Sequence, residues 1–389
     1  MGSMTDQTEQ KIWDFFRAIT KGFLRWRFAY SYQEVDLGTG PCIVLANHTT
    51  DYDPLLIGAA FQKHLTFVAS EHVFRKGIAS RVLNGLFHPI SRMKGTTDAT
   101  AGMAILRALR NGKSICMFAE GNRSFNGVTG PVFPATGKLC RISGAELITY
   151  RIEGGYLTSP RWAKTLRRGK MTGHVVERYS AETLQSISAQ EVNDRINRDL
   201  YEDAFSRQIP DPIPFSGRRL AEGIERAFYL CPRCREIGGI RSKGNRFFCG
   251  CGMSAEYTEY GFLDGEGFPF RTVLEWDKWQ TEQMQKLVLS IGENETAFED
   301  PEVKLQKLSE AHTTEQVDHG LASMGKERLQ IGKTVIPIRN VSSMAVVGPS
   351  KVVFCNEGQY YEIGNTKGNS FCGRKYLEFY EQLSEQRKG

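Results

Sequence analysis

The chain has 389 residues, of which 40% are hydrophobic and 24% are charged, and its formal net charge is +6 at pH 7. This length predicts two or three domains with ample chain for a sizeable core, and the composition is ordinary for a globular protein. The mild positive charge suits an anionic surface or substrate without demanding nucleic acid. No apolar stretch approaches the roughly 20 residues needed to span a bilayer, and no secretory signal peptide is recognised.

Residues 5–32 are predicted to hold an amphipathic helix. Within residues 11–30, apolar side chains recur at helical spacing among Lys and Arg residues, and Asp14 is the only acid. The apolar positions are Ile12, Phe16, Ile19, Phe23 and Trp26, widened by Trp13, Phe15 and Leu24. Such a helix, too short to span a bilayer, has what an interfacial membrane helix needs. The alternative is a helix packed on the next domain.

A continuous apolar run at residues 42–46 is predicted to form a buried strand. His48 follows this run, and Asp53 comes five residues later, before a helix-compatible stretch opened by Pro54. At such a strand-to-helix turn, a carboxylate can fix one imidazole nitrogen and leave the other as a general base. The alternative is that both residues belong to a turn and a helix cap.

Strands and helices alternate along residues 33–208, which are predicted to form one domain. The expected strands are at 65–69, 114–118 and 147–151, and the expected helices are at 55–61 and 99–109, with a basic, helix-like segment after the first of these strands. The alternation predicts an α/β fold with a largely parallel central sheet. Ligands of such sheets gather at the carboxyl ends of strands, where His48, Glu120 and Arg151 fall.

Four blocks of this domain resemble those of the glycerolipid acyltransferase family. Asn47-His48 through Asp53 matches the first block, NHx4D. Arg92 stands where the second block places an arginine. Residues 118–124, FAEGNRS, are similar to the third block, FPEGTRS, and residues 147–152 match the fourth only loosely. The resemblance covers about residues 30–210.

The resemblance implies an O-acyltransferase of phospholipid biosynthesis. It would move a fatty acyl group from acyl-CoA or acyl-ACP to the free hydroxyl of 1-acyl-glycerol 3-phosphate, giving phosphatidic acid. His48 would be the base and Asp53 its partner, with no covalent acyl-enzyme and no catalytic metal. The substrate-binding residues implied are Asn47, Arg92, Glu120, Gly121, Arg123 and Ser124. The protein would work in the cytoplasm, peripherally on the cytosolic face of the membrane, with a lysophospholipid acceptor as its lipid partner.

The residue types fit these roles, and alternatives stay open. Guanidinium groups such as those of Arg92 and Arg123 grip phosphate bidentately, and the glycine of the Glu120-Gly121 turn lets backbone approach a ligand. The acceptor can instead be glycerol 3-phosphate or another lysolipid, or the chain can be an inactive lipid-binding scaffold. A metal-dependent hydrolase would use His48 and Asp53 as metal ligands. It would need a further cluster of His or carboxylate residues, which the sequence does not offer.

A basic stretch at residues 155–173 contains no acid. Its cations are Arg161, Lys164, Arg167, Arg168 and Lys170. They can hold the phosphates of coenzyme A, acyl carrier protein or anionic lipid headgroups, or they can be solvated loop charges.

Residues 209–225 are predicted to be a linker. The following residues, 226–262, contain four cysteines and are predicted to form a zinc ribbon. Its ligands would be two close pairs, Cys231 with Cys234 and Cys249 with Cys251. Four thiolates of this spacing suggest one structural Zn²⁺. Nine cysteines, an odd number, indicate a reducing compartment rather than a disulfide framework. The ribbon lacks dense basic and aromatic interleaving, so no nucleic acid is expected.

The remainder is predicted to be a helical connector at 263–300 and a β-rich domain at 301–389. A helix is expected at 272–289, and a closing helix at 375–383. Between them, short strand-like runs are punctuated by Gly, Asn and Pro, as in a small antiparallel barrel or sandwich. The pattern is similar to pleckstrin-homology-like domains.

Overall fold

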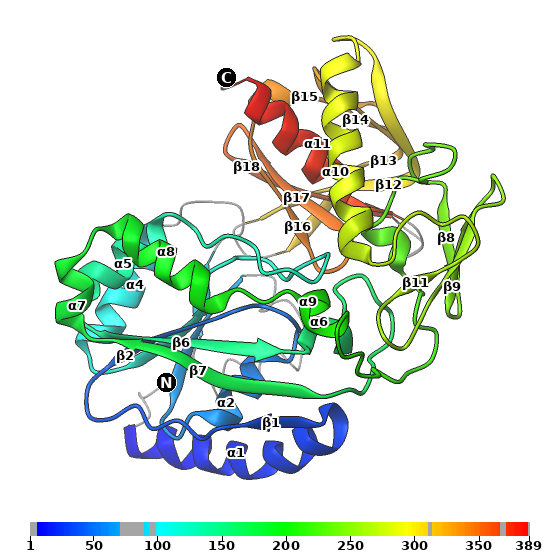
Figure 1. Cartoon of the computed structure of the whole chain (residues 1–389). Coiled ribbons are helices and arrows are strands. Elements are labelled where there is room, and N and C mark those ends of the chain that lie inside the picture. Colours follow the sequence, from blue (N-terminus) through cyan, green and yellow to red (C-terminus); the bar gives the residue numbers. More distant parts are fainter. Residues whose placement is uncertain (1–5, 71–88, 93–98, 310–312, 366–370, 388–389) are drawn as a thin grey trace. The chain divides into compact units, whose positions relative to one another are not determined.

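The structure is a computed structural model that describes residues 6–70, 89–92, 99–309, 313–365 and 371–387 (Figure 1). The chain forms two compact units. Unit 1 comprises Met1–Pro160 and Arg167–Ser216, and unit 2 comprises Arg161–Leu166 and Gly217–Gly389. The helix-like segment expected after residue 70 lies outside the described residues.

Unit 1 is an α/β unit around a seven-stranded sheet of order β1-β7-β6-β2-β5-β3-β4. The strands are β1 (Tyr30–Tyr32), β2 (Cys42–Ala46), β3 (Leu65–Ser70), β4 (Ile90–Arg92), β5 (Ser114–Phe118), β6 (Glu146–Glu153) and β7 (Met171–Tyr179). All neighbouring pairs are parallel except β6 and β7, which are antiparallel. The predicted α/β fold with a largely parallel sheet is confirmed. Sequence reasoning missed β7, which begins inside the basic stretch.

Helices cover both faces of this sheet (Figure 1). They are α1 (Asp6–Phe28), α2 (Asp53–Ala60), α4 (Ala99–Arg110), α5 (Ala135–Ser143), α6 (Gly155–Thr158), α7 (Ala181–Ser186), α8 (Ala189–Leu200) and α9 (Ala204–Gln208). Alternate residues of β2 point to opposite faces, and Ile43 and Leu45 pack in one core with Ile105 of α4 and Ile196 of α8. Helices α1 and α2 lie on the opposite face.

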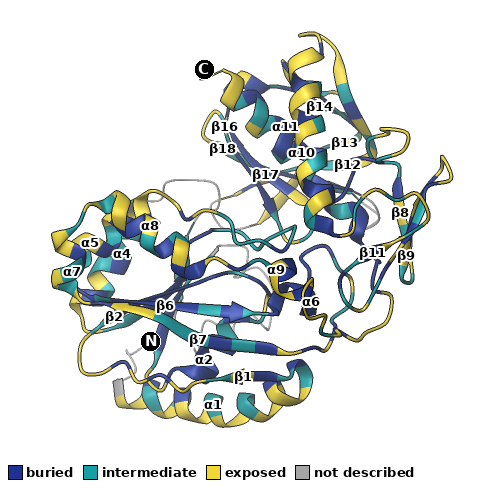
Figure 2. Cartoon of the chain, viewed as in Figure 1, coloured by how far each residue is buried: buried dark blue, intermediate teal, exposed yellow. Residues whose placement is uncertain are grey.

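Helix α1 has one buried apolar face and one exposed apolar face (Figure 2). The buried face contains Trp13, Leu24 and Phe28, and the Trp13 indole N–H donates to the Phe61 carbonyl at 2.9 Å. The exposed face contains Phe15, Ile19, Phe23 and Trp26. Their spacing of four, four and three residues places them on one side of a helix. The single widened stripe expected from the sequence is therefore two separate faces.

No helix of the described residues is long and apolar enough to cross a bilayer. The last turn of α1 is hydrogen-bonded to another segment of unit 1. The Arg168 Nε–H donates to the Trp26 carbonyl at 2.9 Å, and Arg25 and Arg27 lie in the last helical turn. Cations at this end complement the helix dipole.

The basic stretch is divided between buried and exposed cations. The Arg161 side chain, in unit 2, donates from Nη2 to the Val346 carbonyl at 2.7 Å and from Nε to the Gly348 carbonyl at 2.9 Å. Arg167 is also buried, whereas Lys164, Arg168 and Lys170 are exposed. Neither use that the sequence suggested for this stretch, phosphate binding or a solvated loop, describes the two buried arginines.

Unit 2 begins with a small antiparallel sheet of order β11-β10-β9-β8. Its strands are β8 (Ile240–Lys243), β9 (Arg246–Cys249), β10 (Ser254–Tyr257) and β11 (Leu263–Asp264). Helix α10 (Val273–Ser290) follows, and a capping box formed by Thr272 and Glu275 fixes its start. The helix expected at 272–289 is present.

The rest of unit 2 is a seven-stranded antiparallel sheet of order β15-β14-β13-β12-β18-β17-β16. Its strands are β12 (Thr296–Leu308), β13 (Thr314–Gly325), β14 (Arg328–Ile331), β15 (Thr334–Pro337), β16 (Val341–Val347), β17 (Lys351–Asn356) and β18 (Gln359–Asn365). The C-terminal helix α11 (Gly373–Gln386) shares a core with α10 and the sheet. The predicted β-rich region is confirmed, and sequence reasoning missed the long pair β12 and β13.

Candidate functional site

The turn between β2 and α2 brings His48 and Asp53 into direct contact. His48 Nδ1 lies 2.8 Å from Asp53 Oδ2, and Asp53 is fully buried at the start of α2. A proton on Nδ1 that is donated to this carboxylate leaves Nε2 as an acceptor. The arrangement expected from the five-residue spacing is therefore present, and it can serve as a base.

Two threonines between His48 and Asp53 fix the carboxylate. The backbone N–H of Thr49 donates to Oδ2 at 2.7 Å, and its hydroxyl donates to Oδ1 at 3.1 Å. The backbone N–H of Thr50 donates to both oxygens at 3.0 Å, and its hydroxyl donates to Oδ1 at 2.7 Å. Sequence reasoning missed these donors, although the Thr-Thr pair inside the block was a visible signal.

Residues at the end of β5 support His48 from a second side. The Phe118 ring stacks on the imidazole with centroids 4.3 Å apart. Glu120 Oε1 accepts the backbone N–H of His48 at 2.7 Å, and its Oε2 accepts that of Gly130 at 2.7 Å. Burial raises the pKa of the Glu120 carboxyl to about 8, against the lowering effect of these two donors. Glu120 thus joins the first and third sequence blocks.

Gly121 and Phe133 form a close backbone-to-ring contact beside this carboxylate. Gly121 has φ +72°, in the left-handed region, and a Cβ placed on it would lie 2.4 Å from the Phe133 ring. Only glycine meets both demands without strain. The Arg92 guanidinium carbon lies 4.5 Å from the centroid of the same ring. The structure therefore brings Arg92 to the Gly121 turn through Phe133, which sequence reasoning did not single out.

Arg123 and Ser124 make contacts within the protein. Arg123 Nη2–H donates to the Ser159 carbonyl at 2.6 Å, Nε–H donates to the Thr49 carbonyl at 3.3 Å, and Nη1 lies 2.9 Å from Asp51 Oδ2. The Ser124 hydroxyl accepts the backbone N–H of Gly127 at 2.9 Å. Arg123 thus connects the turn after β5 to the loop that carries Asp53.

Asn47 lies beneath the site rather than on its surface. Its side-chain amide donates to the Ile152 carbonyl at 2.8 Å and accepts the Ile152 N–H at 2.8 Å, and the residue is fully buried. This contact joins the end of β2 to the end of β6. It fixes the backbone that leads into His48.

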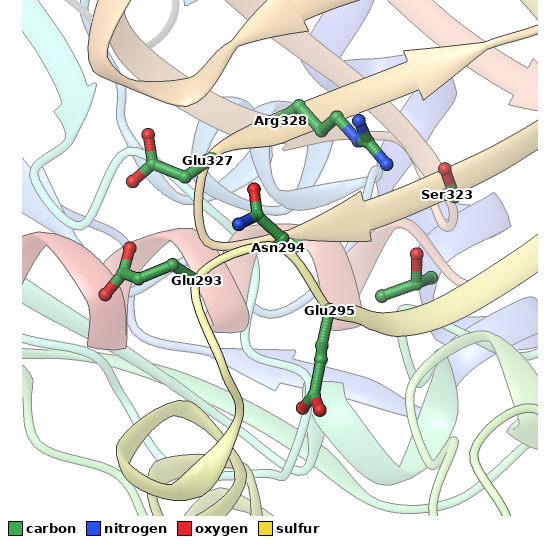
Figure 3. Close-up of a pocket in the computed structure, with 8 residues that line it drawn as sticks. Glu293, Asn294, Glu295, Ser323, Glu327 and Arg328 are labelled. Atoms are coloured by element: carbon green, nitrogen blue, oxygen red, sulfur yellow. The ribbon is translucent and has the colours of Figure 1, made fainter.

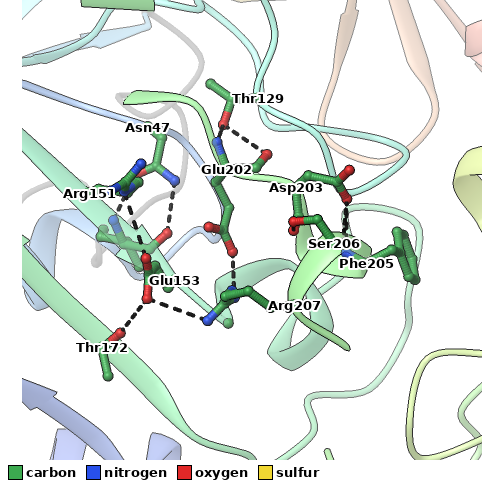
Figure 4. Close-up of polar contacts among 12 residues, drawn as sticks. Asn47, Thr129, Arg151, Glu153, Thr172, Glu202, Asp203, Phe205, Ser206 and Arg207 are labelled. Atoms are coloured by element: carbon green, nitrogen blue, oxygen red, sulfur yellow. Dashed lines mark hydrogen bonds and ion pairs between the residues drawn. The ribbon is translucent and has the colours of Figure 1, made fainter. Parts of the chain in front are cut away.

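A charged cluster lies at the ends of β6 and β7 (Figure 4). Arg207 contacts Glu202 at 2.5 Å and Glu153 at 3.4 Å, and Arg151 lies 3.7 Å from Glu153. Burial raises the pKa of the Glu202 carboxyl to about 7, which Arg207 partly offsets. The Glu202 backbone N–H also donates to the Thr129 hydroxyl, and its carbonyl accepts the Thr129 backbone N–H. The cluster therefore fastens α9 and its preceding loop to the strand ends.

Unit 2 contains a four-cysteine cluster that can hold a metal ion. The sulfur atoms of Cys231, Cys234, Cys249 and Cys251 lie within 4.8 Å of one another. The Cys231–Cys251 and Cys234–Cys249 sulfur distances are both 3.7 Å. Four sulfurs at the Zn–S distance of about 2.3 Å from one tetrahedral ion would be about 3.8 Å apart. The donor set therefore fits such an ion, and within the described part of the chain no other group of metal ligands of this kind occurs.

Unit 2 also contains a pocket (Figure 3). Its polar lining residues are Glu293, Asn294, Glu295, Thr296, Ser323, Glu327 and Arg328. No residue that the sequence suggested as catalytic, substrate-binding or metal-binding lies in it.

Comparison with known proteins finds one family model and one solved structure that are similar to part of this chain. Residues 28–152 match the family model described as Acyltransferase, which spans less than half of the chain and includes His48, Asp53, Arg92, Glu120 and Arg123. The crystal structure of the 1-acyl-sn-glycerophosphate (LPA) acyltransferase PlsC from Thermotoga maritima is similar, with a TM-score of 0.40 and 21% identity. That match covers 51% of this chain and 82% of that chain. No curated protein matches the sequence.

Proposed function

Because residues 28–152 match an acyltransferase family, we propose that this chain acylates 1-acyl-glycerol 3-phosphate to phosphatidic acid in phospholipid biosynthesis. The acyl donor would be acyl-CoA or acyl-ACP. The observation that carries the proposal is the 2.8 Å contact between His48 Nδ1 and the buried carboxylate of Asp53 within that segment.

The chemistry proposed is direct transfer without an acyl-enzyme. His48 Nε2 takes the proton of the acceptor hydroxyl as its oxygen attacks the thioester carbonyl, and Asp53 stabilises the imidazolium. The tetrahedral intermediate then expels the thiolate, which takes the proton from His48. Thr49 and Thr50 hold Asp53, so the imidazole stays in one orientation.

We assign acceptor binding to the turn after β5. Arg92 and Arg123 would meet the phosphate, since a guanidinium binds phosphate through paired N–H groups. Glu120 would hold His48 and Gly130 in place through its two backbone contacts. Asn47 and Ser124 would shape the loops around the acceptor through their backbone contacts.

The proposed acceptor resides in a membrane, and α1 offers a surface to reach it. The exposed side chains of Phe15, Ile19, Phe23 and Trp26 form one apolar face, with Arg25 in the last turn and Arg168 on the Trp26 carbonyl. Apolar side chains beside cations bind an anionic bilayer surface. We therefore propose a peripheral protein on the cytosolic face of the membrane.

We assign the four cysteines to one structural Zn²⁺ in a ribbon over residues 226–262. A bound Zn²⁺ would supply a tetrahedral cross-link between the two cysteine pairs, with no open coordination position for catalysis. We assign residues 33–208 to the acyltransferase domain and residues 301–389 to the β-rich domain.

The test is an acyl-transfer assay on purified full-length protein. Labelled acyl-CoA and, separately, acyl-ACP are supplied with lysophosphatidate, glycerol 3-phosphate and lysolipids of other headgroups, and products are identified by mass spectrometry. We expect phosphatidic acid as the main product, and turnover that brief treatment with EDTA does not abolish. Product from another acceptor alone would reassign the substrate. Binding of lysolipid without turnover from either donor would favour a scaffold.

A further inference from the structure

Phe133 is a large aromatic residue held at the site with 38% of its surface exposed. Its backbone N–H donates to the Ala119 carbonyl at 3.2 Å, which ties it to the end of β5. Its ring lies so close to Gly121 that a methyl group at that position would overlap it. The ring is thus fixed against the turn that follows Glu120.

The same ring carries the guanidinium of Arg92, at 4.5 Å from its centroid. Arg92 ends β4, a three-residue strand paired with β3 through Ser70. An arginine side chain has several rotatable bonds, and contact with an aromatic face restricts the positions that its guanidinium adopts. The ring does not neutralise the positive charge of the guanidinium.

Arg123, the second cation of the turn, is held by oxygen atoms rather than by an aromatic ring. Its guanidinium contacts the carboxylate of Asp51 and the carbonyls of Thr49 and Ser159. It therefore acts partly as a structural link to the loop that carries Asp53. Arg92 is the cation at the Gly121 turn whose position is set by an aromatic contact, with Phe133.

We propose that Phe133 is a positioning residue that holds Arg92 at the Gly121 turn and so determines the affinity for the phosphate of the acceptor. The inference rests on the proposed function, and it names a contact that no sequence block contains. Phe133 does not touch the reacting atoms. It acts through Arg92, and its loss therefore affects phosphate-bearing acceptors selectively.

The experiment compares Phe133→Leu with Phe133→Tyr in the full-length chain. The probes are 1-hexanoyl-glycerol 3-phosphate and 1-hexanoyl-glycerol, which differ only in the phosphate. Dissociation constants come from calorimetry, and KM and kcat come from the acyl-transfer assay. We expect Phe133→Leu to raise both Kd and KM for the phosphate acceptor about three- to tenfold, the range of a cation–π contact, with kcat nearly unchanged. Phe133→Tyr keeps the ring and should behave as wild type.

Arg92→Ala and the double variant complete the test. If Phe133 acts through Arg92, adding Phe133→Leu to Arg92→Ala should raise Kd no further, because the contact is already absent. The phosphate-free acceptor should be unaffected by every one of these changes. Equal Kd and KM for wild type and Phe133→Leu would overturn the proposal. An equal loss with both acceptors would also overturn it, because Phe133 would then only pack the turn.

The calorimetric readout separates this inference from the proposed function. If wild type transfers no acyl group but Phe133→Leu still weakens binding of the phosphate probe through Arg92, the acyltransferase assignment fails and the role of Phe133 stands. If wild type turns over normally and Phe133→Leu matches it, the proposed function stands and the role of Phe133 fails.

Discussion

At the scale of single residues, Asp53 is the most constrained side chain of the site. It is fully buried, and its oxygens accept hydrogen bonds from two backbone N–H groups and two hydroxyls besides the contact with His48. An amide in its place would turn an N–H group toward these donors. The residue therefore cannot be exchanged for its isostere without cost.

The first prediction concerns the pair itself. We expect His48→Ala to lower kcat by about 10²- to 10⁴-fold, the usual contribution of a general base, while the chain stays folded. Asp53→Asn should lower kcat as well and should also lower the thermal midpoint, because it places a donor among donors. His174→Ala, a change of a half-buried histidine on β7, is the matched control and should retain activity. Near wild-type turnover by His48→Ala would refute the mechanism.

The second prediction is a pH dependence that comes from Glu120. Its carboxyl has a pKa of about 8 in the fold, against an ordinary value of 4.5, because it is buried. The folded chain therefore holds the proton over a range in which the unfolded chain has lost it. Glu120 contributes fully to stability below the lower value, and that contribution is lost as the pH rises through the higher one.

Urea unfolding of wild type and Glu120→Gln across this range measures the effect. We expect the free energy of unfolding of wild type, relative to the variant, to decrease steadily as the pH rises from about 5 to about 8. Glu182→Gln, at an exposed carboxylate whose pKa is lowered, should give a flat difference over the same range. A flat difference for Glu120→Gln would show that its two backbone donors outweigh burial.

Sequence spacing was enough to bring His48, Asp53 and Glu120 together, because strand ends of a parallel sheet meet at one edge. It was not enough to find Phe133, which lies 12 residues beyond Gly121 and reaches the turn only through the tertiary fold. The sequence identified Arg123 as a candidate phosphate-binding cation. Its contacts with Ser159 and Asp51 could not be predicted, because they depend on the positions of loops in the tertiary fold.

At the scale of elements, the missed strands share a physical cause. In β12, Val303 and Leu305 are buried, but Glu299, Asp300, Glu302 and Lys307 give the stretch a strongly charged sequence. The strand also carries register shifts against β13, which interrupt a period-two pattern. The sequence consequently predicted a helical connector up to residue 300, whereas β12 already begins at Thr296. Strand β7 was not predicted, because its first residues belong to the basic stretch at 155–173.

The third prediction concerns the cysteine cluster. We expect one zinc ion per chain by elemental analysis, lost in the double variant Cys231→Ser/Cys234→Ser. Loss of a structural zinc removes a cross-link, so the variant and chelator-treated protein should both show a lower thermal midpoint. Cys355→Ser, at a buried thiol outside the cluster, is the control and should keep its zinc. Protein purified without chelator that contains no zinc would contradict the assignment.

At the scale of the whole molecule, helix α1 exposes one apolar face and buries the other. Trp26 is 70% exposed and Phe15 is 69% exposed, whereas Trp13 on the opposite face is 1% exposed. Sequence periodicity alone merged these faces. A variant that alters Trp13 would test the packing of α1 rather than any contact with lipid.

The fourth prediction therefore uses the exposed face only. We expect Phe15→Glu/Ile19→Glu/Trp26→Glu to reduce co-sedimentation with anionic liposomes and activity on vesicle substrate, while activity on a monomeric acceptor and the thermal midpoint change little. Ile142→Glu alters an exposed apolar residue of α5 and is the matched control. If the triple variant binds vesicles as well as wild type, membrane contact must come from another surface.

The segment Arg161–Leu166 gives the chain an unusual connectivity. The backbone leaves unit 1 after Pro160, returns at Arg167 and leaves again after Ser216, so three peptide links join the two units. Trp162 is fully buried against Tyr257, and Arg161 binds carbonyls of Val346 and Gly348. A chain ended at Ser216 would carry this indole and guanidinium without their partners. Unit 1 is consequently not an excisable module, and neither gene truncation nor a single proteolytic cut separates it cleanly from the rest.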